Sequence, residues 1–344
     1  MKKILTRVVV LMLISTLGVA MITGCEKKVT DNNGVSQEST VDKVTKTEKI
    51  DMKVAALKGP TAIGMVQIMQ NAQNDTAKNK YDFQIAGTAD EFTADLIKGD
   101  VQIAAVPCNL AANLYNKSNG KVQIVGINTL GVLYIVQTGD AVKSVEDLKG
   151  KTIYTTGKGT TPEYTLNYLL KSAGIDPEKD VTIEYKSEAT EVAAVLAQSK
   201  QDCVAMLPQP YVTTVMMQNA TVKIALDVTA EWEKYTGSDS SVVTGVVVVN
   251  TEFASKNPEA VSEFISEYKE SVSFVNANVD EAAQLVENFD IFKAAVAKKA
   301  IPYCNITFIE GREMKTKVSS YLKVLYDQNP DSIGGMMPSD NFYK

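Results

Sequence analysis

One order of structural signals occurs twice in this chain: a turn that contains glycine and threonine, a helix, a strand, a second helix and a strand that ends at proline. The first copy runs from Thr61 to Pro107 and the second from Thr161 to Pro208, so the two spacings are nearly equal. Alternating strands and helices predict largely parallel sheets with helices on both faces. The repeat therefore predicts two α/β units of similar build.

The spacing of apolar residues sets the boundaries of the expected elements. In the first unit we expect strands at 52–57, 81–86 and 101–106, and helices at 62–73 and 89–98. In the second unit we expect strands at 151–155, 181–185 and 203–207, and helices at 163–173 and 189–199.

Two long apolar runs, Val132–Gln137 and Val242–Val249, bracket the second unit. They have the length and position of a two-strand hinge, on which the chain leaves one lobe and returns to it. The residues after 250 are mostly helical in pattern and are expected to pack on the first lobe. We therefore predict that lobe 1 consists of 50–136 and 243–344, and that lobe 2 consists of 137–242.

The N-terminal residues have the pattern of a bacterial lipoprotein signal. Lys2, Lys3 and Arg7 precede the apolar run Val8–Met21, and Ile22-Thr23-Gly24-Cys25 follows as a lipobox. The run is shorter than the about 20 residues that a membrane-spanning helix needs. A basic start, a short apolar core and small residues at the cut are typical of a secretory signal. An ordinary signal peptide and an uncleaved anchor helix stay open as alternatives.

This pattern predicts a signal peptide at 1–24, a lipid on Cys25 and a location at the extracytoplasmic face of the cell membrane. Residues 25–49 are polar and are expected to form a flexible, disordered tether. The folded body is then large enough for two lobes.

Composition excludes several function classes. The chain has no histidine and a formal net charge of −6, which argues against His-based catalysis, His-based metal sites and nucleic-acid binding. Arg312 is the only arginine after the signal segment, so a guanidinium clamp on an anion would need that residue. No metal-ligand cluster, P-loop or nucleophile elbow is present, and we expect no metal and no cofactor. Cys108, Cys203 and Cys304 allow at most one disulfide, and small buried side chains are the simpler interpretation.

Candidate binding residues lie where strands end, because ligands of open α/β sheets bind beyond the carboxyl ends of the strands. Helix starts offer backbone N–H groups and threonine hydroxyls to a ligand. Amide side chains that follow the two prolines both donate and accept hydrogen bonds. The candidate ligand contacts are Lys58, Gly59, Thr61, Pro107, Asn109, Lys158, Gly159, Thr160, Thr161, Glu188, Gln209 and Trp232.

Each candidate also has a plainer interpretation. The threonines are typical helix caps, and the lysines are typical solvated surface residues. The amides Asn109 and Gln209 fit local turn chemistry, and Glu188 fits stabilisation of a helix start. Trp232 fits packing in the core as well as stacking on a planar ligand.

Several motifs, in this order and spacing, resemble the solute-binding proteins of nitrate/sulfonate/taurine transporters. The likeness covers about Met52 to about Val286. The motifs are Gly99–Ala104, Leu148–Ile153, Gly159–Thr161, Ser172–Ile175, Leu207–Pro210, Gly245–Phe253 and Asn257–Ala260.

The resemblance implies a type II periplasmic-binding-protein fold, in which two lobes close on a small molecule. It also implies that the protein is a monomer, and that an ABC permease and its ATPase subunit are its partners. The family includes binders of thiamine-related pyrimidines, and scarce arginine favours a neutral or heterocyclic ligand similar to a vitamin precursor. A nitrate, sulfonate or taurine-type anion is the next choice. An enzyme on the same fold and a membrane-tethered sensor or scaffold lipoprotein stay open.

Overall fold

The computed structural model describes residues 48–199, 202–237 and 240–344. The predicted signal peptide, Cys25 and nearly all of the predicted tether lie outside the described residues. Glu48–Lys344 forms one compact unit. Within the described part of the chain, no helix has both the length and the apolar character needed to cross a membrane.

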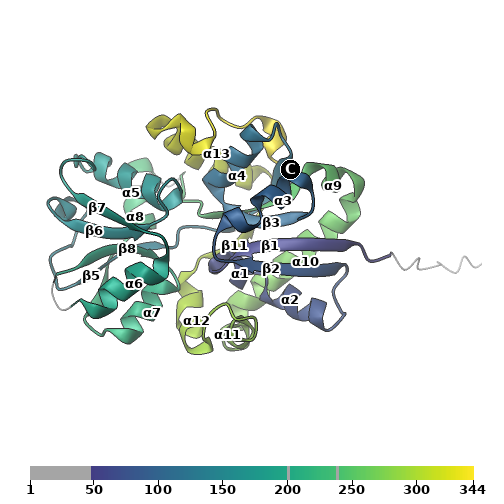
Figure 1. Ribbon diagram of the computed structural model, residues 1–344, viewed down its shortest axis with the longest axis horizontal. Helices are drawn as coiled ribbons and strands as arrows, with labels where there is room; N and C mark the ends of the chain where they lie inside the picture. Colours follow the sequence, from purple (N-terminus) through teal and green to yellow (C-terminus); the bar gives the residue numbers. More distant parts are fainter. Residues whose placement is uncertain (1–47, 200–201, 238–239) are drawn as a thin grey trace, which may run out of the picture. The chain divides into compact units, whose positions relative to one another are not determined.

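The first of two sheets has the strand order β11-β4-β10-β3-β1-β2 (Figure 1). Strands β1, β2 and β3 pair in parallel, as expected for the first unit, whereas β10 pairs antiparallel with β3 and β4. The sheet is therefore mixed and not mostly parallel, because β10 enters it from the opposite direction. The strands are β1 (Asp51–Leu57), β2 (Lys80–Ala86), β3 (Ile103–Pro107), β4 (Val122–Thr129), β10 (Gly245–Asn250) and β11 (Ile306–Ile309).

The second sheet has the order β7-β6-β8-β5-β9 and repeats this plan. Strands β6, β7 and β8 pair in parallel, and β5 pairs antiparallel with β8 and β9. The strands are β5 (Leu133–Thr138), β6 (Thr152–Thr156), β7 (Thr182–Lys186), β8 (Val204–Pro208) and β9 (Val222–Asp227).

Helices cover both faces of each sheet (Figure 1). Buried side chains of α3, α4 and α13 pack on one face of the first sheet, and those of α2, α10 and α11 pack on the other. In the second lobe α5 and α8 lie on one face, and α6 and α7 lie on the other. The helices are α1 (Pro60–Ile63), α2 (Val66–Gln73), α3 (Thr93–Lys98), α4 (Cys108–Lys117), α5 (Thr161–Ser172), α6 (Ala189–Gln198), α7 (Tyr211–Gln218), α8 (Val228–Thr236), α9 (Thr251–Lys256), α10 (Pro258–Ala277), α11 (Val279–Asn288), α12 (Ala294–Ala300) and α13 (Gly311–Gln328).

Helix α10 illustrates why these segments become helices. Its buried residues Val261, Phe264, Tyr268, Val272 and Val275 recur at helical spacing, so one face enters the core. The expected helix at 62–73 is instead two helices, α1 and α2, and the expected helix at 89–98 begins with a 3-10 turn. Helices α4 and α7, which follow the two strand-ending prolines, were not predicted.

The structure moves the first lobe boundary. The apolar run that was predicted as a hinge strand in lobe 1 contains β5, which lies inside the second sheet between β8 and β9. The chain therefore crosses between sheets at 130–132, not at 136–137. The return crossing lies between α8 and β10, near the predicted residue 243. Strands β5 and β10 belong to different sheets and pair with different neighbours, so they are not two adjacent strands of one hinge.

Candidate functional site

The strand ends of the two sheets meet where the chain crosses between lobes. Strands β1, β3 and β4 end, and β10 begins, at one edge of the first sheet. Strands β6 and β8 end, and β5 begins, at one edge of the second sheet. Because only residues 130–132 separate β4 from β5, these two edges face each other. This is the arrangement in which open α/β sheets bind ligands.

Asn109 joins the two lobes at this junction. It is the second residue of α4, and its side chain is buried. Its Nδ2 donates to the carbonyl oxygens of Gly159 (3.4 Å) and Ser332 (3.2 Å), and its Oδ1 accepts from Thr161 Oγ1 (3.3 Å). Two predicted residues of the second lobe are thus brought together with one of the first.

The turn before α5 is held by its own hydrogen bonds. Thr160 Oγ1 donates to the carbonyl oxygen of Gly157 (2.7 Å), and the N–H of Gly159 donates to Glu163 Oε2 (2.5 Å). Gly157 and Gly159 both have positive φ, at 77° and 76°, which explains the choice of glycine. The hydroxyl of Thr161 points across to Asn109 and does not cap its own helix.

The matching turn of the first lobe is built differently. Thr61 Oγ1 donates backwards to the carbonyl oxygen of Leu57 (2.8 Å), so its hydroxyl serves the local chain. The helix that follows has only four residues. Gly59 is buried, whereas the Lys58 side chain is exposed. Pro107, which precedes α4, is half-buried.

Gln209 does not repeat the role of Asn109. Its Oε1 accepts from the backbone N–H (3.2 Å) and the hydroxyl (2.8 Å) of Thr213, one turn later in α7. The side chain therefore stabilises the start of α7, the helix that follows it. Local turn chemistry, the plainer of the two interpretations, describes this residue.

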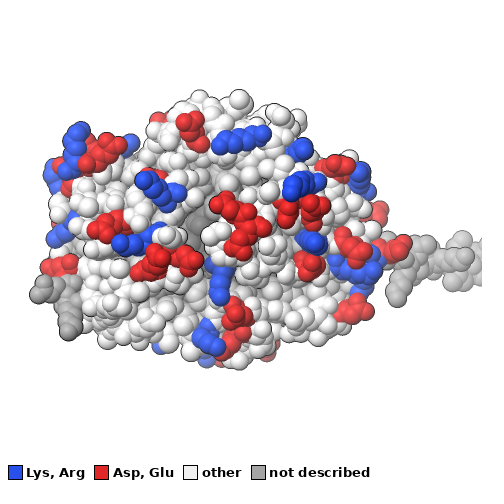
Figure 2. Space-filling model, viewed as in Figure 1, with Lys and Arg blue, Asp and Glu red and all other residues white. Residues whose placement is uncertain are grey.

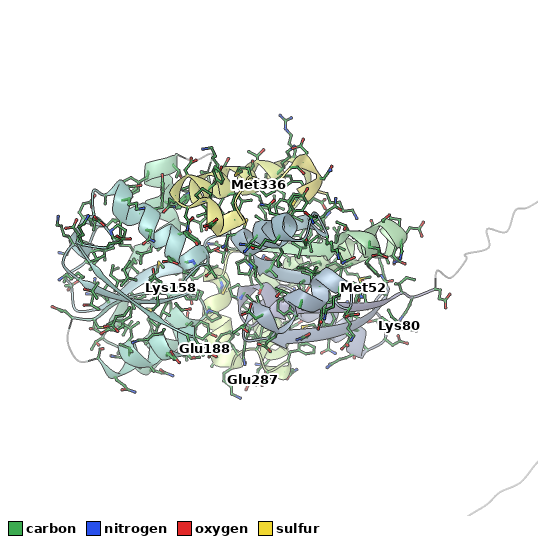
Figure 3. The ribbon with its side chains drawn as sticks, turned by 45° about the horizontal axis from the view of Figure 1, so that its top comes forward. Met52, Lys80, Lys158, Glu188, Glu287 and Met336 are labelled. Atoms are coloured by element: carbon green, nitrogen blue, oxygen red, sulfur yellow. The ribbon has the colours of Figure 1, made fainter. Side chains whose placement is uncertain are left out.

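Two other candidates are exposed side chains that contact neighbours within the second lobe. Lys158 is exposed, and its Nζ lies 5.8 Å from the centre of the Tyr185 ring. Glu188 is exposed and accepts a hydrogen bond from Thr190 (3.1 Å). Figure 3 shows Lys158 and Glu188 on the lobe that carries the second sheet.

Trp232 is a packing residue, and its prediction as a ligand contact is corrected. It has no exposed surface and its Nε1 donates to Ser240 Oγ (3.2 Å). Its ring lies against Tyr168 (centroids 4.5 Å apart) in its own lobe and against Tyr321 (5.5 Å) of the first lobe. An indole closed in on all sides by protein is not available to stack on a ligand.

Sequence reasoning missed a second polar group at the junction. Asn128 and Thr129, at the end of β4, are 1% and 0% exposed, and Tyr268 of α10 is fully buried beside them. Asn128 Nδ2 donates to the Tyr268 hydroxyl (3.0 Å), which donates to the carbonyl oxygen of Thr61 (3.3 Å). The available signal was the largely apolar segment that forms β4, because it ends in two polar residues, Asn128 and Thr129.

Apart from the Glu163 carboxylate, which accepts from the N–H of Gly159, the hydrogen-bonding groups described at the junction are uncharged. Among the described residues, Glu231 and Glu267 are the only charged side chains in the buried set, and Arg312 is exposed. Burial raises the pKa of the Tyr268 phenol well above its ordinary value, so it stays protonated. Figure 2 shows a hollow near the middle of the visible face, with acidic side chains on its rim.

In the part of the chain that the structure describes, cysteine, aspartate and glutamate are the side chains that could together hold a metal ion, because the chain has no histidine. No group of three or more Cys, Asp or Glu side chains there is arranged to hold a metal ion. Cys108, Cys203 and Cys304 are free and buried, and burial raises the pKa of all three thiols. They are the small buried side chains of the simpler interpretation.

Known proteins share this fold. The family model described as NMT1/THI5 like matches residues 121–282. A protein of Parabacteroides distasonis described as an ABC transporter superimposes with a TM-score of 0.71 at 22% identity, over 86% of this chain and 99% of that one. The periplasmic aliphatic sulphonate binding protein of Escherichia coli gives a TM-score of 0.67 at 16% identity, over 84% and 91%.

Sequence relatives match a smaller share of the chain. A protein of Brucella abortus, described only as a candidate binding protein, is 27% identical over 176 residues, which are 51% of this chain and 52% of that protein. The chain thus spans about half the length of the curated relatives it matches. Together these matches confirm the predicted resemblance, and the structures confirm the two-lobe periplasmic-binding-protein fold.

Proposed function

We propose that this chain is the solute-binding component of an ABC importer. It captures a small organic molecule between its two lobes and delivers it to a membrane permease driven by an ATPase subunit. It acts by binding alone and as a monomer. A lipid on Cys25 holds it at the extracytoplasmic face of the membrane.

The observation that carries this proposal is the convergence of polar groups from both lobes on one junction. Asn109 of the first lobe and Thr161 of the second lie within hydrogen-bond distance, 3.3 Å apart. The backbone of the turn before α5 takes part through Gly159. Rotation of the lobes about the two short connections would separate these groups and admit a ligand between them. The fold of the E. coli sulphonate binding protein supports the same mode of action.

The ligand class follows from the side chains at the junction. Amides and hydroxyls suit an uncharged polar molecule, and no buried lysine or arginine is present among the described residues to neutralise an anion. We therefore favour a neutral or heterocyclic compound, similar to a vitamin precursor, over a nitrate, sulfonate or taurine-type anion.

A thermal-unfolding panel tests the proposal. The full-length chain in detergent is heated with pyrimidines, flavins, amino acids, aromatic acids, taurine, methanesulfonate and nitrate. A ligand at 100 times its dissociation constant adds about 2.7 kcal/mol to the stability of the folded state. Any molecule carried through purification is released by denaturant and identified by mass spectrometry. A protein that binds none of the panel and carries no ligand contradicts the proposal.

The double variant Thr160→Val/Thr161→Val locates the site. Valine keeps the shape of threonine and removes the hydroxyl. We expect the dissociation constant of the stabilising compound to rise by about tenfold, equivalent to about 1.4 kcal/mol, with the fold intact. Thr221→Val, at an exposed hydroxyl that bonds only to nearby Asn219, is the matched control. Equal affinity in the double variant and the control would remove this turn from the site.

A further inference from the structure

Three oxygen atoms at the junction edge of the first sheet are buried without a hydrogen-bond partner among the described residues. They are Asn128 Oδ1, Thr129 Oγ1 and Thr244 Oγ1. Buried polar atoms are nearly always paired, so an unpaired group needs an explanation. Three such atoms close together point to a partner that the folded chain does not itself supply.

The three residues are neighbours. The backbone N–H of Thr244 donates to the carbonyl oxygen of Thr129 (3.1 Å), which places the two threonines side by side. A Cβ atom added at Gly245 would lie 2.6 Å from Asn128 Oδ1, 2.9 Å from Thr61 Cγ2 and 3.3 Å from Thr129 Cβ. Because Gly245 has no side chain, the side chains of Asn128, Thr129 and Thr61 lie close to its backbone.

The orientation of the Asn128 amide is fixed by Tyr268. The Tyr268 hydroxyl has one proton, which it donates to the carbonyl oxygen of Thr61. Towards Asn128 it therefore acts as an acceptor, and the atom that faces it must be Nδ2, which donates to it. The opposite atom of the amide, Oδ1, is consequently held as an acceptor. The two threonine hydroxyls adapt to either role, but this oxygen does not.

We propose that Asn128 Oδ1 is a specificity determinant that requires an N–H donor on the ligand and disfavours oxyanions. The ligand is an uncharged molecule with an amide-like or ring N–H group that points at the end of β4. Nitrate and sulfonate offer only acceptor oxygens, and these repel a fixed carbonyl oxygen. Tyr268 acts as a positioning residue, because it sets the direction of the amide. This inference rests on the proposed function and deepens it.

The first test compares probes that differ in donors. Uracil and cytosine carry N–H groups, dimethyluracil has both ring N–H groups methylated, and nitrate and methanesulfonate are acceptor-only anions. We expect uracil or cytosine to bind the full-length chain in detergent at least about tenfold more tightly than dimethyluracil or either anion, measured by isothermal titration and thermal shift. Preference for an anion, or equal affinity for uracil and its dimethyl derivative, overturns the proposal.

The second test uses Tyr268→Phe, which keeps the ring and removes the hydroxyl. The amide is then free to turn and present Nδ2, so discrimination between N–H probes and anions should fall by about tenfold. Tyr81→Phe is the control, because the hydroxyl of Tyr81 bonds to Asn79 (3.5 Å) and Glu267 (2.5 Å), outside this group. A merely structural role of Tyr268 would lower the unfolding temperature and leave the ratio of affinities unchanged.

Asn128→Asp is the third test, because it changes the charge at this place and not the size of the side chain. The carboxylate is isosteric with the amide, keeps an acceptor at this place and adds a negative charge, so the variant should reject anions even more strongly and still bind N–H probes. Tight binding of nitrate or methanesulfonate by the wild type, lost in Thr160→Val/Thr161→Val, would overturn the donor preference and leave the proposed function standing. Absence of any ligand, bound or carried through purification, would overturn both.

Discussion

Asn109 and Gln209 occupy matching places in the two halves of the repeat, yet they do different work. Each lies one or two residues after a strand-ending proline; Asn109 is the second residue of α4, and Gln209 lies two residues before α7. Asn109 bonds to the second lobe and to the C-terminal segment, whereas Gln209 accepts hydrogen bonds from Thr213 of the helix that follows it. The longer side chain folds back on its own chain, and the shorter one reaches outward.

The threonines of the two turns repeat this contrast in reverse. Thr161 in the second lobe reaches across to Asn109, and Thr61 in the first lobe bonds backwards to Leu57. The first lobe therefore bonds to the second through the Asn109 amide, and the second bonds to the first through the Thr161 hydroxyl. The matching groups, on Thr61 and Gln209, bond within their own lobes. A sequence repeat predicts which residues reach the junction, but tertiary contacts decide which of them join the lobes.

The largest expected effect tests whether apolar packing carries more of the lobe contact than these polar groups. Trp232→Ala removes the ring that lies between Tyr168 and Tyr321. We expect the free energy of unfolding to fall by about 3–5 kcal/mol, as for other large buried aromatic side chains. Chemical denaturation measures this loss, with Trp232→Phe as the smaller change. Lost ligand binding with unchanged stability would instead restore Trp232 as a ligand contact.

A smaller loss of stability is expected at Gly245, where neighbouring side chains leave no space for a Cβ atom. Gly245→Ala places a methyl group 2.6 Å from Asn128 Oδ1 and 2.9 Å from Thr61 Cγ2. Crowding of this kind costs about 1–3 kcal/mol. Ligand affinity should fall as well, because Asn128 must move. Gly87→Ala is the matched control, because neither Gly87 nor Gly245 has a positive φ and a Cβ atom at Gly87 would meet only Glu91 Oε1, at 3.6 Å. If Gly245→Ala had the stability of the wild type, the structure around Gly245 would have space for a methyl group, and the crowding argument would be wrong.

Much of this architecture could be predicted, because it rests on local signals. Apolar spacing, proline and glycine identified both units, their parallel strands and the strand-end turns, including Asn109 and Thr161. Strand pairing across long distances has no such signal. Nothing in the run Val132–Gln137 tells whether it pairs with the first or the second sheet, and antiparallel partners on both sides decided it.

The candidate site was predicted only in part for a related reason. Asn128 and Tyr268 lie far apart in the sequence, and their relation arises when α10 packs against the end of β4. Trp232 misled because a single tryptophan has the same local pattern whether it packs or binds. Sequence patterns point to residues near turns, and they do not point to residues whose relation depends on the approach of two distant elements.

The contrast between the two amides can be tested directly. Asn109→Ala removes hydrogen bonds between lobes and should lower the free energy of unfolding by about 1–3 kcal/mol. It should also shift the ligand-free protein towards separated lobes, seen as a larger radius of gyration in X-ray scattering. Gln209→Ala removes a helix-start bond worth about 1 kcal/mol and should leave the radius unchanged. Equal behaviour of the two variants would contradict the division of roles.

The smallest effect is expected at the lysines that flank the two turns. Lys158, in the second lobe, is exposed, and its ammonium group lies over the Tyr185 ring. Lys58, in the first lobe, is also exposed. An exposed cation near a ring contributes about 0.5–1 kcal/mol, so Lys158→Gln should lower the free energy of unfolding by no more than that, and Lys58→Gln by less. Neither should change the affinity for an uncharged ligand by more than about threefold, since about 0.6 kcal/mol corresponds to that factor. Suppose that either variant lost much of its affinity at low salt and that high salt removed the difference from the wild type. The ligand would then be an anion, selected by charge and not by the amide and hydroxyl groups of the junction.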